Sequence, residues 1–326
     1  MLVKRELPWR PRIVVHYGDW VLTGYLAAPG FLKELCAELG AHQSVYDDLV
    51  IVNGPVQPTV WARNVWQDVR KIEFKSIGEA TRQLRALGLR WNYHEYQHPT
   101  QSNHRRAALI SEGLVSPKFA PLRFSQDVMP SKALGSWAMI SEGEILASSK
   151  CSATTPDGDI TFVEDKALPP TRAYLKLWEA FTRIGAAPLK GSHCIDLGSC
   201  PGGWSWVLAT LGSHVTSVDK APLDPEIAKM PLINFLKTSA FGLSPKDFSK
   251  MDWVFSDVIC QPEKLLDLVL AWMKVFPDAN YVCTIKLMGE TDHEVVQKFQ
   301  QIPNSKVVHL THNKHELTWI RMGSQS

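Results

Sequence analysis

The second half of the chain alternates short apolar segments with stretches of helical length. A helix is expected from Thr171, because Leu175, Trp178 and Phe181 recur at the spacing of an apolar helix face. Five β-rich segments follow at intervals long enough for helical crossovers, namely 193–198, 214–220, 233–238, 251–257 and 281–287. Two more segments, 305–311 and 315–322, are separated by three residues and predict a hairpin.

This alternation predicts an α/β fold, in which a doubly wound, Rossmann-like sheet of seven mostly parallel strands ends in an antiparallel hairpin. The first half has irregular apolar runs with many Pro and Trp residues, and for it we expect a smaller α+β domain. We place the N-terminal domain at residues 1–134 and the Rossmann-like domain at 135–326. The polar segment 156–170 closes with two prolines and is typical of a connector.

Composition excludes several other classes of protein. Of the 326 residues, 45% are hydrophobic and 21% charged, the range of an ordinary packed protein. The net charge of +2 is too balanced to indicate a polyanionic partner by itself. The six Cys form no CxxC pair and predict neither a disulfide framework nor a metal site. No apolar run is long enough for a membrane helix or a signal core, so we expect a cytoplasmic protein without membrane contact.

The ends of the strands carry the candidate chemistry, because ligands of such sheets bind beyond the carboxyl ends of the strands. The first strand ends in DLGSCPGGW, residues 196–204, whose glycines allow a sharp turn and a close approach of the backbone to a ligand. The second strand ends in Asp219, which can accept hydrogen bonds from both hydroxyls of a ribose. NAD enzymes share a Gly-rich turn with a downstream acid, although the form here is not GxGxxG.

The motif DLGSCPGGW resembles the cofactor loop of the FtsJ-like S-adenosyl-L-methionine-dependent RNA 2′-O-methyltransferases. The Lys-Asp-Lys-Glu tetrad of that family would be Lys176, Asp257, Lys286 and Glu316. Within the family the chain is most similar to the RlmM-type enzymes, which methylate a cytidine ribose of 23S ribosomal RNA in bacteria. The resemblance covers residues 170–322 and is patchy earlier, where 137–148 resembles the strand entering the catalytic domain.

The resemblance implies a class I methyltransferase fold, a metal-independent reaction and a set of cofactor-binding residues. These are Asp196, Gly198, Cys200, Pro201, Gly202, Gly203, Trp204, Asp219, Ser239 and Asp257. The chain departs from the family at Ser239, which stands where relatives carry an acid that contacts the adenine amino group. Residues 28–34 and 59–63 resemble pieces of the family's N-terminal domain, but the region between them and Trp137 is too short for the family's full RNA-binding THUMP module.

The tetrad has a chemical rationale. A ribose 2′-hydroxyl is a poor nucleophile until it is deprotonated, whereas a sulfonium methyl donor is already activated. We expect Lys286 to accept the proton, which requires a pKa lowered from ~10.4 to about 8, with Lys176 assisting. Asp257 would position Lys286, and Glu316 would hold a lysine or a ribose hydroxyl. Taken singly, the lysines could be solvated, Asp257 a helix N-cap and Glu316 a member of a cross-strand ion pair.

An RNA-binding platform is predicted in segment 63–106, which carries nine Arg or Lys against four acids. Aromatic residues that could stack on bases are interleaved with them, namely Trp61, Trp66, Phe74, Trp91, Tyr93 and Tyr96. The alternative is that Arg82, Arg85 and Arg90 form the solvent-exposed face of a helix whose Leu84 and Leu87 face the core. The expected partner is RNA, ribosomal RNA or a ribosome precursor, and the expected state is a monomer.

Other functions remain open from the sequence. The same chemistry on transfer RNA or a cap would use the same tetrad, and a non-enzymatic RNA-binding protein could retain the fold. A dinucleotide oxidoreductase fits less well because of the Pro-Gly-Gly turn and the lysines. Amino methylation usually needs Pro-Pro-aromatic after the fourth strand, where this chain has Val258 and Ile259 after Asp257. Carbon methylation needs a cysteine nucleophile, and Cys260 is expected to be a packed, inert thiol.

Overall fold

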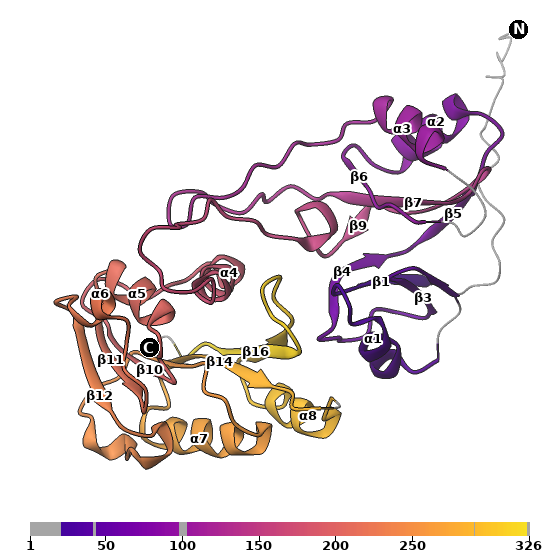
Figure 1. Cartoon of the computed structure of the whole chain (residues 1–326). Coiled ribbons are helices and arrows are strands. Elements are labelled where there is room, and N and C mark those ends of the chain that lie inside the picture. Colours follow the sequence, from indigo (N-terminus) through magenta and orange to yellow (C-terminus); the bar gives the residue numbers. More distant parts are fainter. Residues whose placement is uncertain (1–20, 42–43, 98–102, 290, 325–326) are drawn as a thin grey trace, which may run out of the picture.

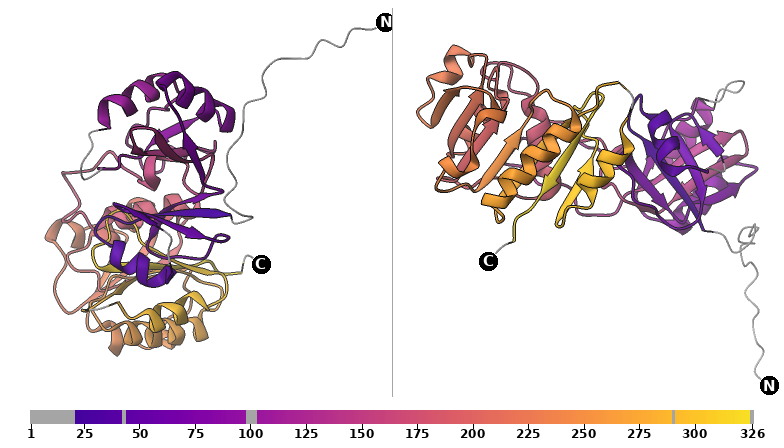
Figure 2. Two further views of the ribbon diagram at one scale, coloured as in Figure 1. Left: turned by 90° about the vertical axis from the view of Figure 1, so that its right-hand side faces the viewer. Right: turned by 90° about the horizontal axis from the view of Figure 1, so that it is seen from below.

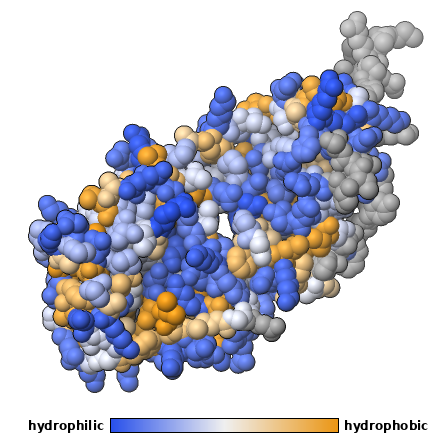
Figure 3. Space-filling model, in the orientation of Figure 1, coloured by the Kyte–Doolittle hydropathy of each residue, from blue (hydrophilic) through white to orange (hydrophobic). Residues whose placement is uncertain are grey.

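The computed structural model describes residues 21–41, 44–97, 103–289 and 291–324. The chain forms two halves, with a single large sheet in the C-terminal half and two smaller sheets in the N-terminal half (Figure 1). The face shown in Figure 3 is mostly hydrophilic, with apolar side chains in scattered patches, and it is hollowed between the two halves. Among the described residues, no helix is both long enough and apolar enough to span a bilayer.

The C-terminal sheet confirms the predicted Rossmann-like fold. Its strands are β10 (His193–Leu197), β11 (His214–Asp219), β12 (Ile233–Lys237), β13 (Trp253–Ser256), β14 (Asn280–Lys286), β15 (Ser305–Val308) and β16 (Glu316–Arg321). They lie in the order β12-β11-β10-β13-β14-β16-β15. The first five pair in parallel, and β16 runs antiparallel to both β14 and β15. All seven predicted strands are therefore present, and the expected hairpin is β15–β16.

Helices cover both faces of this sheet, as a doubly wound fold requires (Figure 1). One face carries α4 (Tyr174–Ile184), α5 (Gly203–Thr210) and α6 (Pro225–Ala228), and the other carries α7 (Pro262–Val275) and α8 (His293–Gln300). Short 3₁₀ turns, η2 (Ala240–Gly242) and η3 (Pro245–Asp247), connect β12 to β13. The helix expected from Thr171 is α4, whose apolar side chains are buried against the sheet.

The N-terminal half contains two sheets. The five-stranded sheet consists of β1 (Leu22–Ala27), β2 (Ser44–Tyr46), β3 (Leu49–Asn53), β4 (Ala62–Gln67) and β9 (Lys150–Cys151), with α1 (Leu32–Leu39) packed on it. The four-stranded sheet consists of β5 (Arg70–Glu73), β6 (Trp91–Tyr93), β7 (Gly135–Ser141) and β8 (Glu144–Ser148). Helices α2 (Ile77–Leu87) and α3 (His104–Glu112) share a hydrophobic core with it. The turn η1 (Pro156–Gly158) begins the connector to the C-terminal half.

The boundary that we expected at residue 135 falls inside the N-terminal half, and this prediction is corrected. Strands β7 and β8 pair with β6 and β5, so the segment expected to enter the catalytic domain belongs to the four-stranded sheet. The segment before β7 packs against the C-terminal half, where Phe124 stacks on Trp178 of α4 with ring centroids 4.8 Å apart. The chain then returns to form β7, so the sheets divide at the connector before α4.

The two halves also touch directly, at the connection between β15 and β16 of the large sheet (Figure 2). Phe31 stacks on Trp61 with centroids 4.8 Å apart and lies 4.7 Å from the ring of His309. The backbone N–H of His309 donates to the carbonyl of Val60 at 3.1 Å. One hydrophobic cluster therefore runs from α1 and the five-stranded sheet into the α7 and α8 side of the large sheet.

Candidate active site

The four tetrad residues meet at the carboxyl edge of the large sheet. Lys176 comes from the first turns of α4, Asp257 directly follows β13, Lys286 ends β14 and Glu316 begins β16. Lys176 Nζ lies 2.9 Å from Asp257 Oδ2 and 3.0 Å from Glu316 Oε1. Lys286 Nζ lies 2.6 Å from both Asp257 Oδ1 and Glu316 Oε2. Each ammonium group bridges both carboxylates, so the four side chains form a closed ring of alternating charge.

The ring is largely withdrawn from water, which makes its charges interdependent. Lys176 is buried, and the side chain of Lys286 is only 19% exposed. Burial by itself would raise the pKa of Asp257, but the charges of Lys176 and Lys286 outweigh it and hold that pKa below its usual value. Burial would likewise lower the pKa of Lys286, but Asp257 and Glu316 outweigh it and raise that pKa.

The single-residue alternatives are largely removed by this geometry. Lys176 is not on a solvated helix face, and Lys286 points into the ring. Asp257 is not the N-cap of α7, which is Gln261. Glu316 does form the cross-strand ion pair with Lys286, because the two residues are directly opposite in the β14–β16 register, and it also binds Lys176.

An open pocket of about 290 Å³ adjoins the ring and shares Asp257 with it. Among the predicted cofactor-binding residues, the pocket is lined by Gly198, Cys200, Asp219, Ser239 and Asp257. The sequence reasoning missed Val218, Lys220, Thr238, Ala240, Phe241, Val258 and Ile259, which line it as well. All of them end or follow the strands β11, β12 and β13, so the strand-end rule that found Asp219 applied to them too.

The carboxylate of Asp219 is fixed at the pocket wall by two backbone hydrogen bonds. Its Oδ2 accepts from the N–H of Cys200 at 3.0 Å, and its Oδ1 accepts from the N–H of Ala221 at 2.9 Å. The loop after β10 is thereby tied to the end of β11. Cys200 contributes its backbone here, as expected, while its thiol contacts the carbonyl of Pro222.

The glycines of the loop serve packing as well as access. Gly198 has φ +81°, and a Cβ there would lie 2.7 Å from the Cα of Val258. Gly202 has φ +116°, and a Cβ there would lie 2.7 Å from a methyl carbon of Ile227. The positive φ and the close neighbours both require glycine, so the loop passes tightly between the β13 end and α6.

Several predicted cofactor-binding residues do not line the pocket, namely Asp196, Pro201, Gly202, Gly203 and Trp204. Trp204 is buried, donates its indole N–H to the carbonyl of Ala173 at 2.9 Å, and lies beneath the ammonium of Lys176 at 5.8 Å. Its side chain therefore supports α4 and the tetrad lysine.

Asp196 is fully buried beneath the loop, where it accepts a hydrogen bond from the Ser205 hydroxyl at 2.7 Å. Burial raises the pKa of this carboxyl to about 7. Its Oδ1 has no hydrogen-bond partner among the described residues. The alternation of β10 explains this placement, because a residue at that position points into the layer between the sheet and α5.

The cysteines give no sign of nucleophilic or metal chemistry. Burial raises the pKa of the Cys260 thiol, which disfavours the thiolate that carbon methylation needs. Within the part of the chain that the structure describes, no group of three or more His, Cys, Asp or Glu side chains is placed to hold a metal ion.

The predicted RNA platform in segment 63–106 is corrected in its stacking component. Four of its six aromatics are buried, namely Trp61, Trp66, Phe74 and Trp91. Their rings form the cores of the N-terminal sheets and cannot receive bases. The alternative, an amphipathic helix with its arginines on the solvent side, is closer to the structure. Arg82 and Arg85 lie on the exposed side of α2 and Leu84 is buried, although Leu87 is 38% exposed.

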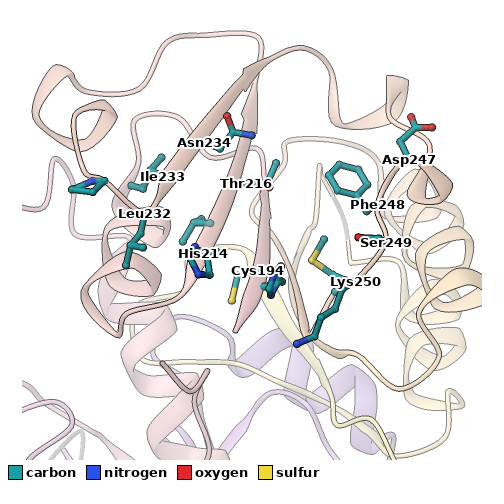
Figure 4. Close-up of a pocket in the computed structure, with 14 residues that line it drawn as sticks. Cys194, His214, Thr216, Leu232, Ile233, Asn234, Asp247, Phe248, Ser249 and Lys250 are labelled. Atoms are coloured by element: carbon teal, nitrogen blue, oxygen red, sulfur yellow. The ribbon is translucent and has the colours of Figure 1, made fainter. Parts of the chain in front are cut away.

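A further pocket of about 350 Å³ lies at the opposite edge of the sheet, where the strands begin (Figure 4). His193 and His214 line it with ring centroids 5.5 Å apart, and Lys250 pairs there with Asp252 at 3.4 Å. The length of β10, about 16 Å for five residues, separates this pocket from the tetrad. It is therefore not part of the candidate active site.

Comparison with known families agrees with this geometry. Residues 170–321 match the family model described as FtsJ-like methyltransferase. Over these residues the chain is similar to the FtsJ-like methyltransferases. The match supports the expected cofactor, S-adenosylmethionine, and the sheet order and the tetrad both lie within the matched residues.

Curated relatives share the name ribosomal RNA large subunit methyltransferase M. The one from Halorhodospira halophila is 37% identical over 108 residues, covering 32% of this chain and 31% of the relative. That from Xanthomonas oryzae pv. oryzae is 31% identical over 173 residues, covering 48% and 49%. That from Xylella fastidiosa is 29% identical over 195 residues, covering 55% of each. The chain spans about half the length, or less, of these relatives.

Proposed function

We propose that this protein transfers a methyl group from S-adenosylmethionine to a ribose 2′-hydroxyl of RNA, and that the target is a cytidine of ribosomal RNA. The observation that carries the proposal is Asp257, which lines the pocket and is ion-paired with both lysines of the tetrad. The methyl donor and the groups that handle the proton would thus be neighbours. The relatives' shared name supports ribosomal RNA as the substrate.

The pocket residues fit this cofactor. The fixed carboxylate of Asp219 would accept hydrogen bonds from ribose hydroxyls, and Ser239, which also lines the pocket, would contact the adenine. Asp257 would lie at the methionine end, beside the tetrad. When bound, the cofactor supplies an electrophilic methyl group on a positively charged sulfur, so no metal is required.

Lys286 would accept the proton of the 2′-hydroxyl. In the ring its pKa is raised, so it is held as the ammonium and must first lose a proton. The positively charged sulfur of a bound cofactor would add a further charge beside Asp257. A positive charge lowers the pKa of a neighbouring lysine, because it disfavours the protonated form of that lysine. Lys176 stays bound to both carboxylates and keeps Asp257 and Glu316 in place while Lys286 changes its charge.

The test is methyl transfer from labelled S-adenosylmethionine to ribosomal RNA and, in a separate reaction, to transfer RNA, both purified from cells that lack this protein, followed by nucleoside analysis. We expect label in 2′-O-methylcytidine. Label in a base-methylated nucleoside would refute the ribose chemistry. Label in 2′-O-methylated nucleosides of transfer RNA, with none in ribosomal RNA, would refute the ribosomal target and keep the chemistry.

A further inference from the structure

A second hollow, which we call the base groove, opens beside the cofactor pocket. It has a volume of about 530 Å³ and is lined by Phe241, Ile259, Cys260, Gln261, Lys264 and Met288. Phe241 and Ile259 line both the groove and the cofactor pocket, so the two hollows are contiguous. The groove is built from three separate connections, those that follow β12, β13 and β14.

The groove walls continue directly from the tetrad. Ile259 and Cys260 follow Asp257 by two and three residues, and Met288 follows Lys286 by two. Cys260 therefore lies within about 11 Å of Asp257, and Met288 within about 8 Å of Lys286, measured between Cα atoms. A ribose held at Lys286 would accordingly have the groove within reach of its own base.

Exposed apolar side chains converge on this hollow. Ile259 is 79% exposed, Met288 58% and Phe241 47%. Scattered exposed apolar residues are ordinary on a protein surface, but three from separate connections around one pocket indicate a binding surface. Their faces would pack against the two sides of a flat ring, as apolar and sulfur-bearing side chains do.

Two polar side chains give the groove a hydrogen-bonding edge. Gln261 occupies the N-cap position of α7, yet its side chain makes no capping hydrogen bond, and it is exposed. A Gln amide offers both a donor and an acceptor, which matches the edge of a nucleobase. Lys264, one turn into α7, adds a donor and a positive charge beside the groove.

We propose that the base groove receives the unpaired base of the nucleotide whose ribose is methylated, and that Gln261 reads its edge. This proposal rests on the proposed function, because it assigns the groove to the same RNA substrate. RNA bases are read in this way only when they are unstacked, so the target would be a single-stranded or extruded nucleotide. Apolar walls with a polar edge suit a neutral, flat ring better than a run of phosphates.

The test uses Met288→Ala and Gln261→Ala, because both residues line the groove and neither lines the cofactor pocket. The matched control is Leu189→Ala, since Leu189 is 79% exposed and lies before β10 at the opposite end of the sheet. Each variant is assayed with ribosomal RNA from cells lacking the protein, and its affinity for S-adenosylhomocysteine is measured by calorimetry.

We expect Met288→Ala to raise the RNA KM about tenfold, the size of a lost base contact, with cofactor affinity unchanged. Gln261→Ala should do the same and should also spread the label over more than one 2′-O-methylated nucleoside. Leu189→Ala should behave as wild type. Normal KM and a single labelled nucleoside in both groove variants would overturn the proposal, and so would an effect confined to cofactor affinity. Absence of any 2′-O-methylation by the wild-type protein would instead refute the proposed function.

Discussion

Two charge clusters among the described residues resemble one another, and they differ in whether they adjoin a pocket. The tetrad is described above. The other, here called the N-terminal ion cluster, consists of Asp48, Arg63, His94, Asp157 and Asp159. Arg63 lies 2.8 Å from Asp48 and 3.0 Å from Asp159, and His94 Nε2 lies 3.0 Å from Asp48 Oδ1. Both clusters join segments far apart in the chain.

The electrostatics of the two clusters are also similar. Burial would lower the pKa of His94, but Asp157 and Asp48 outweigh it and raise that pKa to about 9. The pKa of Asp48 is lowered, since His94 and Arg63 outweigh the effect of burial. A perturbed pKa in a buried network is therefore not enough to identify a catalytic site. The two clusters differ in location. The N-terminal ion cluster links β4 to the connector at η1, whereas the tetrad adjoins the cofactor pocket.

The largest expected effect is on catalysis by the tetrad. Lys286→Ala removes the proposed proton acceptor and should lower kcat by about 100- to 10,000-fold. Affinity for S-adenosylhomocysteine should stay within a few fold, because Lys286 does not line the cofactor pocket. Turnover and calorimetry on the same preparation give both numbers. Near-normal turnover would remove Lys286 as the acceptor.

In the N-terminal ion cluster the expected effect is on stability. Arg63→Ala leaves Asp159 without its cation and Asp48 with His94 alone, and should lower the free energy of unfolding by about 3 kcal/mol. The matched control is Lys71→Ala, which breaks the surface pair with Glu144 and should cost less than about 1 kcal/mol. Urea unfolding measures both. A loss of kcat per folded molecule with unchanged stability would contradict the structural role of this cluster.

A smaller effect is expected at the cofactor pocket. Asp219→Ala removes the carboxylate that would hold the ribose hydroxyls and should weaken S-adenosylhomocysteine binding about tenfold, measured by calorimetry. Asp219→Asn keeps an acceptor for the Cys200 N–H and serves as the control for the loop. Unchanged affinity in the Ala variant would show that the ribose is not bound there.

The remaining expected effect is a change in how the free energy of unfolding varies with pH. The pKa of Asp196 is about 7 in the folded protein and ~3.9 when unfolded, so the native state binds the extra proton between these values. Stability contributed by this group is present below about pH 4 and is lost as pH rises towards 7. Asp196→Asn should therefore gain stability relative to wild type across that range, in urea unfolding at several pH values. Parallel curves would contradict the raised pKa.

The sequence predicts the parts of this fold that are built from local periodicity. The seven strands and α4 follow from apolar spacing, and the tetrad members follow because each lies at a strand end or on α4. The sheets of the N-terminal half are harder to predict from the sequence. Residues around Phe124 pack on the C-terminal half before the chain forms β7 in the N-terminal half, and no local pattern encodes this path. The burial of Trp66 and Trp91 is not encoded locally either, since aromatic rings among basic residues suit a core as well as an RNA surface.

The same limit applies inside the site. Asp196 and Trp204 lie in the loop motif, but the direction of a side chain within a motif depends on which neighbours pack against it. As single apolar residues in the sequence, Phe241 and Ile259 carry no functional signal, because their importance comes from convergence with Met288 in three dimensions.

The central claim is that the tetrad directs a methyl group to a ribose 2′-oxygen, and alkaline hydrolysis tests it directly. A free 2′-hydroxyl is required for alkali to cleave the neighbouring phosphodiester, so a 2′-O-methylated nucleotide survives within a dinucleotide. Ribosomal RNA labelled by the wild-type protein should yield its label in alkali-resistant dinucleotides, and Lys286→Ala should yield none. Label released as mononucleotides would place the methyl group on a base and contradict the account.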